Sequence, residues 1–163
     1  MSKEYISKFA KDLKNPDAEM KVLALGMGMQ STALYLMSSM GLFERADVAI
    51  FSDPMSEHPD TYKLVEWLLK WSKECADSIP IHIVKTDLKK DLLKPKYYPN
   101  KDVYFYPSLP VYFNSKDGDD AMGMRTCTAK YKIEPVEKKV RELMGLKKGQ
   151  RVRPYEVWLN LEP

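Results

Sequence analysis

The residues best suited to chemistry lie in one short segment that runs from Gly26 to Thr32, with the sequence GMGMQST. Gly26 and Gly28 let the backbone approach a ligand closely, and the hydroxyls of Ser31 and Thr32 add hydrogen-bond donors. If a helix begins here, its first N–H groups and its dipole attract an anion such as a phosphate. The segment lacks the lysine of a P-loop and the third glycine of a GxGxxG fingerprint. It therefore predicts a phosphate site of modest specificity, beside the alternative of a tight turn capped by Ser31.

The elements that would position this segment alternate between strand and helix. Apolar runs and helical patterns predict, in chain order, helix 5–13, strand 21–25, helix 31–40, strand 47–51, helix 59–77, strand 79–84, helix 134–144 and strand 155–161. Pro59 and Pro135 suit first helical turns, and Gly41 and Gly145 suit helix ends. This order predicts right-handed crossovers and an α/β fold, a three-layer sandwich with a mostly parallel sheet and helices on both faces.

Residues from about 85 to 123 break this rhythm. This insert contains four prolines and seven aromatic side chains. A loop of such length inside a compact domain is usually either functional or disordered. The aromatic content favours an ordered lid or a substrate-facing segment, and the alternative is an irregular packing insert that covers the edge of the sheet.

The composition is that of a globular protein, with 163 residues, 44% hydrophobic and 30% charged, which predicts a single domain over 1–163. No apolar stretch reaches the roughly 18 residues of a membrane helix, and the first residues lack a signal-peptide core. Cys75 and Cys127 are too few for a disulfide framework or a four-cysteine cluster. We therefore expect a cytoplasmic protein with no membrane partner, whose net charge of +3 leaves room for an anionic ligand.

Three blocks of the sequence resemble one protein family. The block from Leu25 to Thr32 (LGMGMQST) resembles the PP-loop of the adenine nucleotide alpha hydrolase superfamily, which includes ATP pyrophosphatases and phosphoadenosine phosphosulfate (PAPS) reductases. The block from Phe51 to Pro59 (FSDPMSEHP) resembles the family's Phe-Ala-Asp-Thr-Gly-x-Glu-x-Pro segment. The block from Arg125 to Pro135 (RTCTAKYKIEP) resembles its Arg-x-Cys-Thr-x-x-Tyr-Lys-Ile-x-Pro segment. The first block resembles in particular that of a PAPS reductase-like branch common in phages and mobile elements, whose loop reads like Leu-Gly-Ala-Gly-Val-Gln-Ser.

The resemblance implies a Rossmann-like PP-loop fold that holds ATP or a related adenine nucleotide. It also implies cleavage between the α and β phosphates, adenylation of an acceptor, and a requirement for Mg2+. The residues that it places on the phosphates are Gly26, Gly28, Gln30, Ser31 and Thr32.

The resemblance further implies that Asp53 and Glu57 face the nucleotide or its metal ion from the carboxyl end of the second strand. Arg125 and Lys132 would bring positive charge to the phosphates or to an anionic substrate. Asp53, Arg125 and Lys132 are thus the candidate catalytic residues. Two plainer roles stay open, since Asp53 could cap the turn before Pro54 and Glu57 could be a solvated carboxylate in a first helical turn.

The chain departs from the familiar form of the loop, which has aspartate where Gln30 stands and serine where Gly26 stands. A neutral Gln30 cannot bind a metal ion as a carboxylate would. Two alternatives to an ATP pyrophosphatase therefore remain: a sulfonucleotide reductase, whose catalytic cysteine is usually on a C-terminal tail that we do not find, and a nucleotide-binding protein without turnover. Cys127 fits a small residue in a turn better than a redox pair.

The remaining expectations concern partners and metal ligands. His58 and His82 lack metal-site spacing with a second ligand, so no metal site made of protein side chains alone is predicted. The last third of the chain is rich in lysine and arginine, which is typical of a solvated helix face, with contact to tRNA or DNA phosphates as the alternative. A homo-oligomer is left open.

Overall fold

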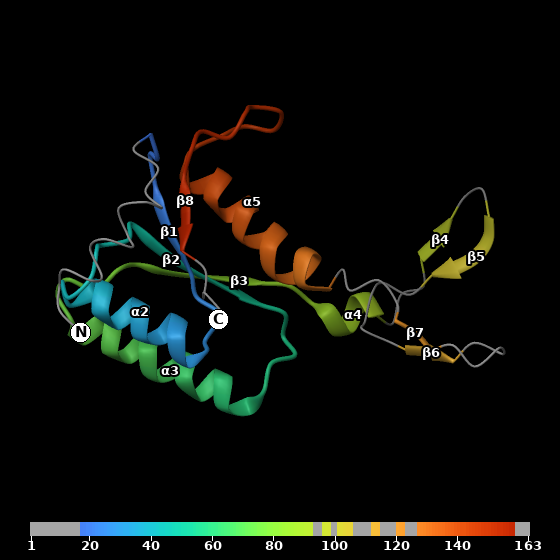
Figure 1. Cartoon of the computed structure of the whole chain (residues 1–163), viewed down its shortest axis with the longest axis horizontal. Coiled ribbons are helices and arrows are strands. Elements are labelled where there is room, and N and C mark those ends of the chain that lie inside the picture. Colours follow the sequence, from blue (N-terminus) through green and yellow to red (C-terminus); the bar gives the residue numbers. More distant parts are fainter. Residues whose placement is uncertain are drawn as a thin grey trace.

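Four parallel strands organise the chain in a computed structural model, which describes residues 17–92, 96–98, 101–105, 112–114, 120–122 and 127–158. Their order across the sheet is β3-β2-β1-β8, where the strands are β1 (Lys21–Ala24), β2 (Val48–Asp53), β3 (Ile81–Lys85) and β8 (Glu156–Trp158) (Figure 1). All three pairings between them are parallel. The predicted α/β fold with a parallel sheet is confirmed. The helix expected at 5–13 and the end of the last strand at 159–161 lie outside the described residues.

Helices cover both faces of this sheet. On one face lie α2 (Met29–Ser39) and α3 (Pro59–Glu74), and on the other lies α5 (Glu134–Leu143) (Figure 1). The connections β1-α2-β2 and β2-α3-β3 step in the same direction across the sheet, so two right-handed crossovers place both helices on one face. The chain then returns past β1 to β8, which places α5 on the opposite face. No helix in the described ranges is long and apolar enough to span a bilayer.

The core is divided into two layers by the alternation of side chains along the strands. On β1, Leu23 joins the cluster under α2 and α3 that includes Leu68, whereas its neighbour Val22 joins the cluster under α5 that includes Val140. All six residues of β2 are buried, as expected for a central strand covered on both faces. Burial of a side chain such as Leu68 contributes about 1.5–3 kcal/mol.

The helix ends follow the predicted signals. α3 begins at Pro59, where a missing N–H costs nothing, and the ring nitrogen Nδ1 of the preceding His58 accepts a hydrogen bond from the N–H of Asp60 at 3.3 Å. Gly41 and Gly145 follow α2 and α5 with φ values of 71° and 68°, in the left-handed region that favours glycine. α2 begins at Met29, two residues before the predicted start at Ser31.

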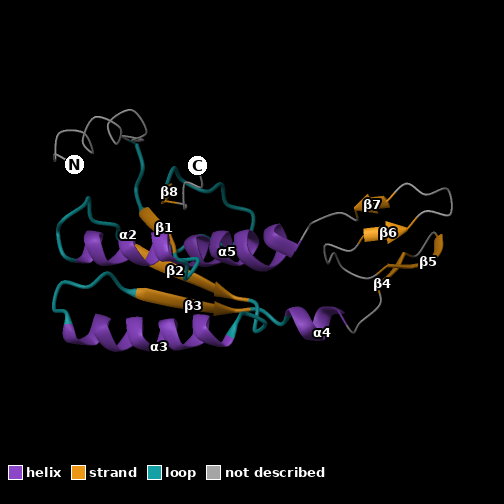
Figure 2. Cartoon of the chain, turned by 60° about the horizontal axis from the view of Figure 1, so that its bottom comes forward, coloured by secondary structure: helices purple, strands orange, loops and turns teal. Residues whose placement is uncertain are grey.

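The insert contains more regular structure than the sequence predicted. A short helix, α4 (Leu88–Leu92), is followed by two antiparallel pairs, β4 (Lys96–Tyr98) with β5 (Lys101–Phe105) and β6 (Tyr112–Asn114) with β7 (Asp120–Met122). These strands are too short and too close to prolines to give a clear period-two pattern. In both views the hairpins lie beyond α4, past the end of the sheet and not along an edge strand (Figures 1 and 2).

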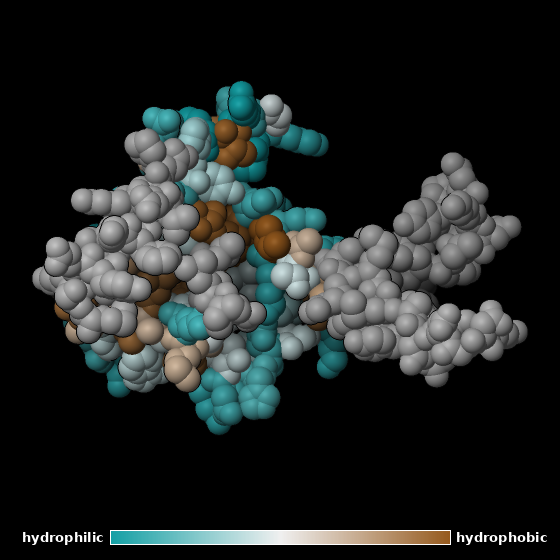
Figure 3. Space-filling view, in the orientation of Figure 1, coloured by the Kyte–Doolittle hydropathy of each residue, from teal (hydrophilic) through white to brown (hydrophobic). Residues whose placement is uncertain are grey.

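Exposed apolar side chains are scattered over the surface. On the face drawn in Figure 3 the described hydrophobic residues form separate groups among hydrophilic ones. The larger exposed apolar side chains are Met29, Met40, Leu42, Met55, Trp67, Ile83, Ile133 and Val157. Single exposed apolar residues are normal for a globular protein, so they do not by themselves mark a docking surface.

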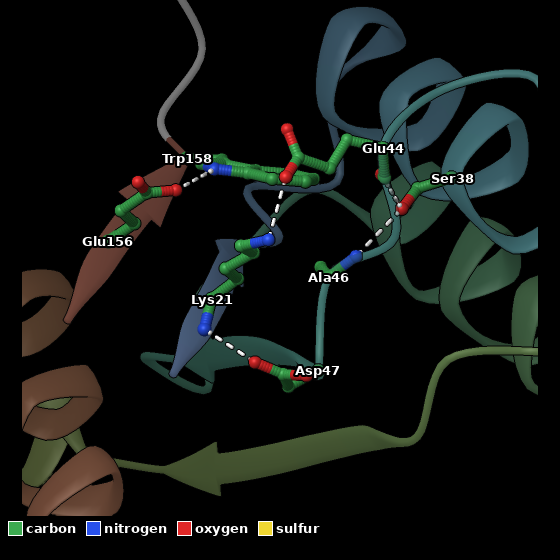
Figure 4. Close-up of polar contacts among 7 residues, drawn as sticks. All are labelled: Lys21, Ser38, Glu44, Ala46, Asp47, Glu156 and Trp158. Atoms are coloured by element: carbon green, nitrogen blue, oxygen red, sulfur yellow. Dashed lines mark hydrogen bonds and ion pairs between the residues drawn. The ribbon is translucent and has the colours of Figure 1, made fainter. Parts of the chain in front are cut away.

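Short polar contacts fasten the loop that leads from α2 into β2 (Figure 4). Ser38 Oγ donates to the carbonyl of Glu44 at 2.6 Å and accepts from the N–H of Ala46 at 3.0 Å. The N–H of Lys21 donates to Asp47 Oδ2 at 2.7 Å, and Lys21 Nζ forms an ion pair with Glu44 at 2.6 Å. These contacts join the starts of β1 and β2 and so support their register.

The loop contacts predict a stability effect of Ser38. Its side chain is buried, and Ser38→Ala would leave the N–H of Ala46 and the carbonyl of Glu44 without this partner. We expect the free energy of unfolding to fall by about 1–3 kcal/mol, measured by urea denaturation. The exposed Ser56 serves as the control, and Ser56→Ala should change it by less than about 0.5 kcal/mol. Equal stabilities for the two variants would contradict the assigned role.

Candidate functional site

The candidate site lies at the carboxyl edge of the sheet. Because β1, β2 and β3 are parallel, the loops that follow them open on the same side, where ligands bind in open α/β sheets. Leu25, just after β1, still donates its N–H to the carbonyl of Ile50 at 2.9 Å. The segment from Gly26 to Thr32 therefore leaves the sheet directly beside the last residues of β2.

The first turn of α2 offers backbone donors. Gly28 is the N-cap residue, with φ −87° and ψ 171°, and no side chain caps the helix. The N–H of Thr32 is the first to reach a helical acceptor, the carbonyl of Gly28, at 3.1 Å. The N–H groups of Met29, Gln30 and Ser31 have no acceptor within the helix, since an α-helix leaves its first donors unpaired. This geometry suits an anion at the helix start.

The two hydroxyls of the segment have different surroundings. Ser31 is fully buried and donates its hydroxyl to the carbonyl of Gly28 at 3.2 Å, so it does not cap the helix as the alternative prediction required. Thr32 is 7% exposed, and its Oγ1 is a buried oxygen without a hydrogen-bond partner among the described residues. An unpaired buried hydroxyl costs about 1–3 kcal/mol. The side chain of Gln30, in contrast, is exposed.

Two residues at this edge have a strained backbone. Met27 and Met55 have φ values of 56° and 57°, and they lie in the loops after β1 and β2. Left-handed backbone costs a residue with a Cβ roughly 1–2 kcal/mol, and such strain gathers at functional sites. Gly26 and Gly28 do not adopt positive φ, so the residue that makes the tight turn is Met27, which sequence reasoning did not single out.

Asp53 is the last residue of β2 and is 6% exposed. Its Oδ1 accepts hydrogen bonds from the N–H of Met55 at 2.8 Å and from the hydroxyl of Tyr62 at 3.0 Å. The first contact is the turn-capping role that was left open for Asp53. Within the described part of the chain no hydrogen bond reaches Oδ2, so the carboxylate caps the turn and keeps one oxygen for another partner.

Glu57 and Lys132 come together from distant parts of the sequence. Lys132 Nζ lies 3.0 Å from Glu57 Oε1, and the two side chains are 53% and 24% exposed. Lys132 belongs to η1 (Ala129–Ile133), a π-helical turn that leads into α5 and that the sequence did not predict. Such turns are frequent at functional sites. Arg125, the remaining candidate catalytic residue beside Asp53 and Lys132, lies outside the described residues.

A second polar cluster fixes η1 against β2 and α4. Ser52 Oγ donates to the carbonyl of Tyr131 at 2.6 Å. Asp91 of α4 accepts from the hydroxyl of Tyr131 at 2.9 Å and pairs with Lys130 Nζ at 3.0 Å. Burial lowers the pKa of Lys130, but its hydrogen bonds to Tyr131 and Asp91 outweigh this and raise it above its usual value. Lys130 thus stays charged and holds α4 to η1.

The basic residues near the C-terminus have mainly structural contacts. Arg141 donates to the carbonyl of Gln150 at 2.9 Å, and Arg153 pairs with Glu19 at 2.6 Å. Arg141 is in the last turn of α5 and Arg153 is three residues before β8, so both lie toward the edge of the sheet at which the parallel strands begin. A nucleic-acid contact at these residues would be remote from the candidate site.

The described residues give no metal-binding cluster of their own. In the ranges that the structure covers, no group of three or more His, Cys, Asp or Glu side chains is arranged to hold a metal ion. Cys75 caps the end of α3 and Cys127 lies just before η1, and both are free thiols. A cation at the carboxyl edge would need further ligands from water or from a bound anion, and Mg2+ is usually held by one or two carboxylates in this way.

Comparison of the chain with protein-family models, with curated proteins and with solved structures finds no match. The assignment of function therefore rests on the geometry of the carboxyl edge together with the pattern of residues in the sequence.

The unpaired hydroxyl of Thr32 predicts an unusual stability effect. Thr32→Val replaces a buried hydroxyl without a partner by a methyl group of the same size. In the absence of ligand we expect the free energy of unfolding to rise by about 1 kcal/mol, measured by urea denaturation. Thr61→Val, at a half-buried threonine in the first turn of α3, is the control and should have an effect below about 0.5 kcal/mol. A clear loss of stability in Thr32→Val would mean that the hydroxyl has a structural partner.

Proposed function

We propose that the chain binds ATP or a related adenine nucleotide at the start of α2, in the manner of the PP-loop superfamily that its sequence resembles. The observation that carries the proposal is the unpaired hydroxyl of Thr32 beside the unpaired N–H groups of the first turn. Donors kept without a partner cost stability, and an anion that accepts from them repays that cost. Phosphate oxygens are acceptors of the required charge.

We further propose that Mg2+ accompanies the nucleotide. The open Oδ2 of Asp53 and the carboxylate of Glu57 fit such an ion, because Mg2+ is usually held by one or two carboxylates together with phosphate oxygens and water. When bound, the ion would neutralise charge on the phosphates. Gln30 is exposed and neutral. The carboxylates of Asp53 and Glu57 would therefore bind the ion in place of the aspartate that the familiar form of the PP-loop carries.

The proposed reaction is cleavage between the α and β phosphates. A nucleophile of the acceptor forms a bond to the α phosphorus, the bond from that phosphorus to the bridging oxygen breaks, and pyrophosphate leaves with the electron pair. The acceptor's proton passes to solvent. The groups of this chain position the phosphates and neutralise charge through the N–H groups of α2 and the ammonium of Lys132, with Arg125 as an expected further cation. A tRNA or DNA acceptor stays a hypothesis.

Nucleotide binding is tested with Thr32→Val. We expect the dissociation constant for α,β-methylene-ATP, which resists cleavage, to rise about 10- to 100-fold by isothermal titration calorimetry, because a hydrogen bond to a charged group is lost. Thr61→Val is again the matched control and should bind as the wild type does. Equal affinity of Thr32→Val and wild type would contradict a phosphate at this position.

Turnover is tested with Lys132→Gln, which removes the charge that faces Glu57. With ATP, Mg2+ and water as the acceptor, we expect the rate of pyrophosphate release at saturating ATP to fall about 100-fold. Lys63→Gln is the matched control, because Lys63 also pairs with a carboxylate, that of Asp60 at 2.8 Å, and lies on the exposed side of α3.

Sulfite release from PAPS with a thiol donor would instead support the reductase alternative. Tight binding with neither product would identify a nucleotide-binding protein without turnover.

A further inference from the structure

Tyr62 lies between the two acidic residues of the candidate site. It is the fourth residue of α3, and its hydroxyl donates to Asp53 Oδ1 at 3.0 Å while it accepts from the N–H of Glu57 at 3.3 Å. The direction of these two hydrogen bonds is fixed, because an ionised carboxylate only accepts and a backbone N–H only donates. A single hydroxyl thus contacts the side chain of Asp53 and the backbone of Glu57.

The hydrogen bonds on Asp53 are unequally shared between its oxygens. Oδ1 accepts both from Tyr62 and from the N–H of Met55, whereas Oδ2 accepts none within the described residues. Two donors on one oxygen fix the rotation of a carboxylate that is already nearly buried. The oxygen that is left to a ligand is therefore defined as Oδ2.

We propose that Tyr62 is a positioning residue that presents Asp53 Oδ2 to the Mg2+ ion of a bound nucleotide. The inference rests on the proposed function, and it adds a residue that touches neither nucleotide nor metal. The same hydroxyl also accepts a hydrogen bond from the N–H of Glu57, and the side chain of Glu57 pairs with Lys132. The start of α3 thus contacts the side chain of Asp53, at the end of β2, and only the backbone of Glu57, in the loop after β2.

The test compares Tyr62→Phe with wild type in titrations with α,β-methylene-ATP, once with Mg2+ and once with EDTA. The donors of α2 are unchanged in the variant, so its affinity in EDTA should equal that of wild type. The gain in affinity that Mg2+ gives should fall by about tenfold, because Asp53 loses one of two donors and with it a fixed orientation. Tyr155→Phe, the same change at a half-buried tyrosine near β8, should retain the full gain.

A double-mutant cycle with Asp53→Asn shows whether Tyr62 acts through Asp53. We expect Tyr62→Phe to have no further effect on the Mg2+ gain in the Asp53→Asn background. An unchanged gain in Tyr62→Phe, an equal loss of affinity with and without Mg2+, or a full effect in the Asp53→Asn background would overturn the inference and leave nucleotide binding intact. A wild-type protein that binds nucleotide without any Mg2+ gain would overturn the inference together with the proposed Mg2+ ion, and would leave nucleotide binding intact. Failure of the wild type to bind nucleotide would overturn both proposals.

Discussion

Parallel pairing forces β1, β2 and β3 to end at the same edge of the sheet, because each crossover helix must return the chain to the amino side before the next strand begins. The loop before α2 is therefore a neighbour of the turn after Asp53 and of the start of α3, although it is far from them in sequence. α5 runs back along the opposite face, so the turn that precedes it, with Lys132, also begins at this edge. The polar groups of the candidate site thus lie together because the strands run in the same direction.

Much of the fold could be predicted from the sequence because it depends on patterns that are local. Short apolar runs identified the buried strands, and Pro59, Gly41 and Gly145 marked helix ends that the structure confirms. The hairpins of the insert could not be predicted, since their strands have only three to five residues. The π-helical turn at 129–133 was also missed, because Tyr131 in this turn bonds to Ser52 and Asp91, which are far away in the sequence.

The candidate site was predictable in its residue types but not in its connections. Asp53, Glu57 and Lys132 were all singled out, and the structure adds that Glu57 pairs with Lys132. Tyr62 was not singled out, although its hydroxyl donates to Asp53. The hydroxyl of Ser31 has a partner and that of Thr32 has none among the described residues. This difference depends on the exact positions of single atoms, which no sequence pattern predicts. Nucleotide binding and catalysis remain proposals that build on this geometry.

The contacts between α4 and η1 hold the two ends of the insert together. Asp91 on one side and Lys130 and Tyr131 on the other join the two points at which the chain leaves and re-enters the sheet domain. With its ends held together by these contacts, a segment can change length at an entropic cost of only about 0.6 kcal/mol for each doubling. The residues between them can therefore vary in length and in type without any change in the sheet.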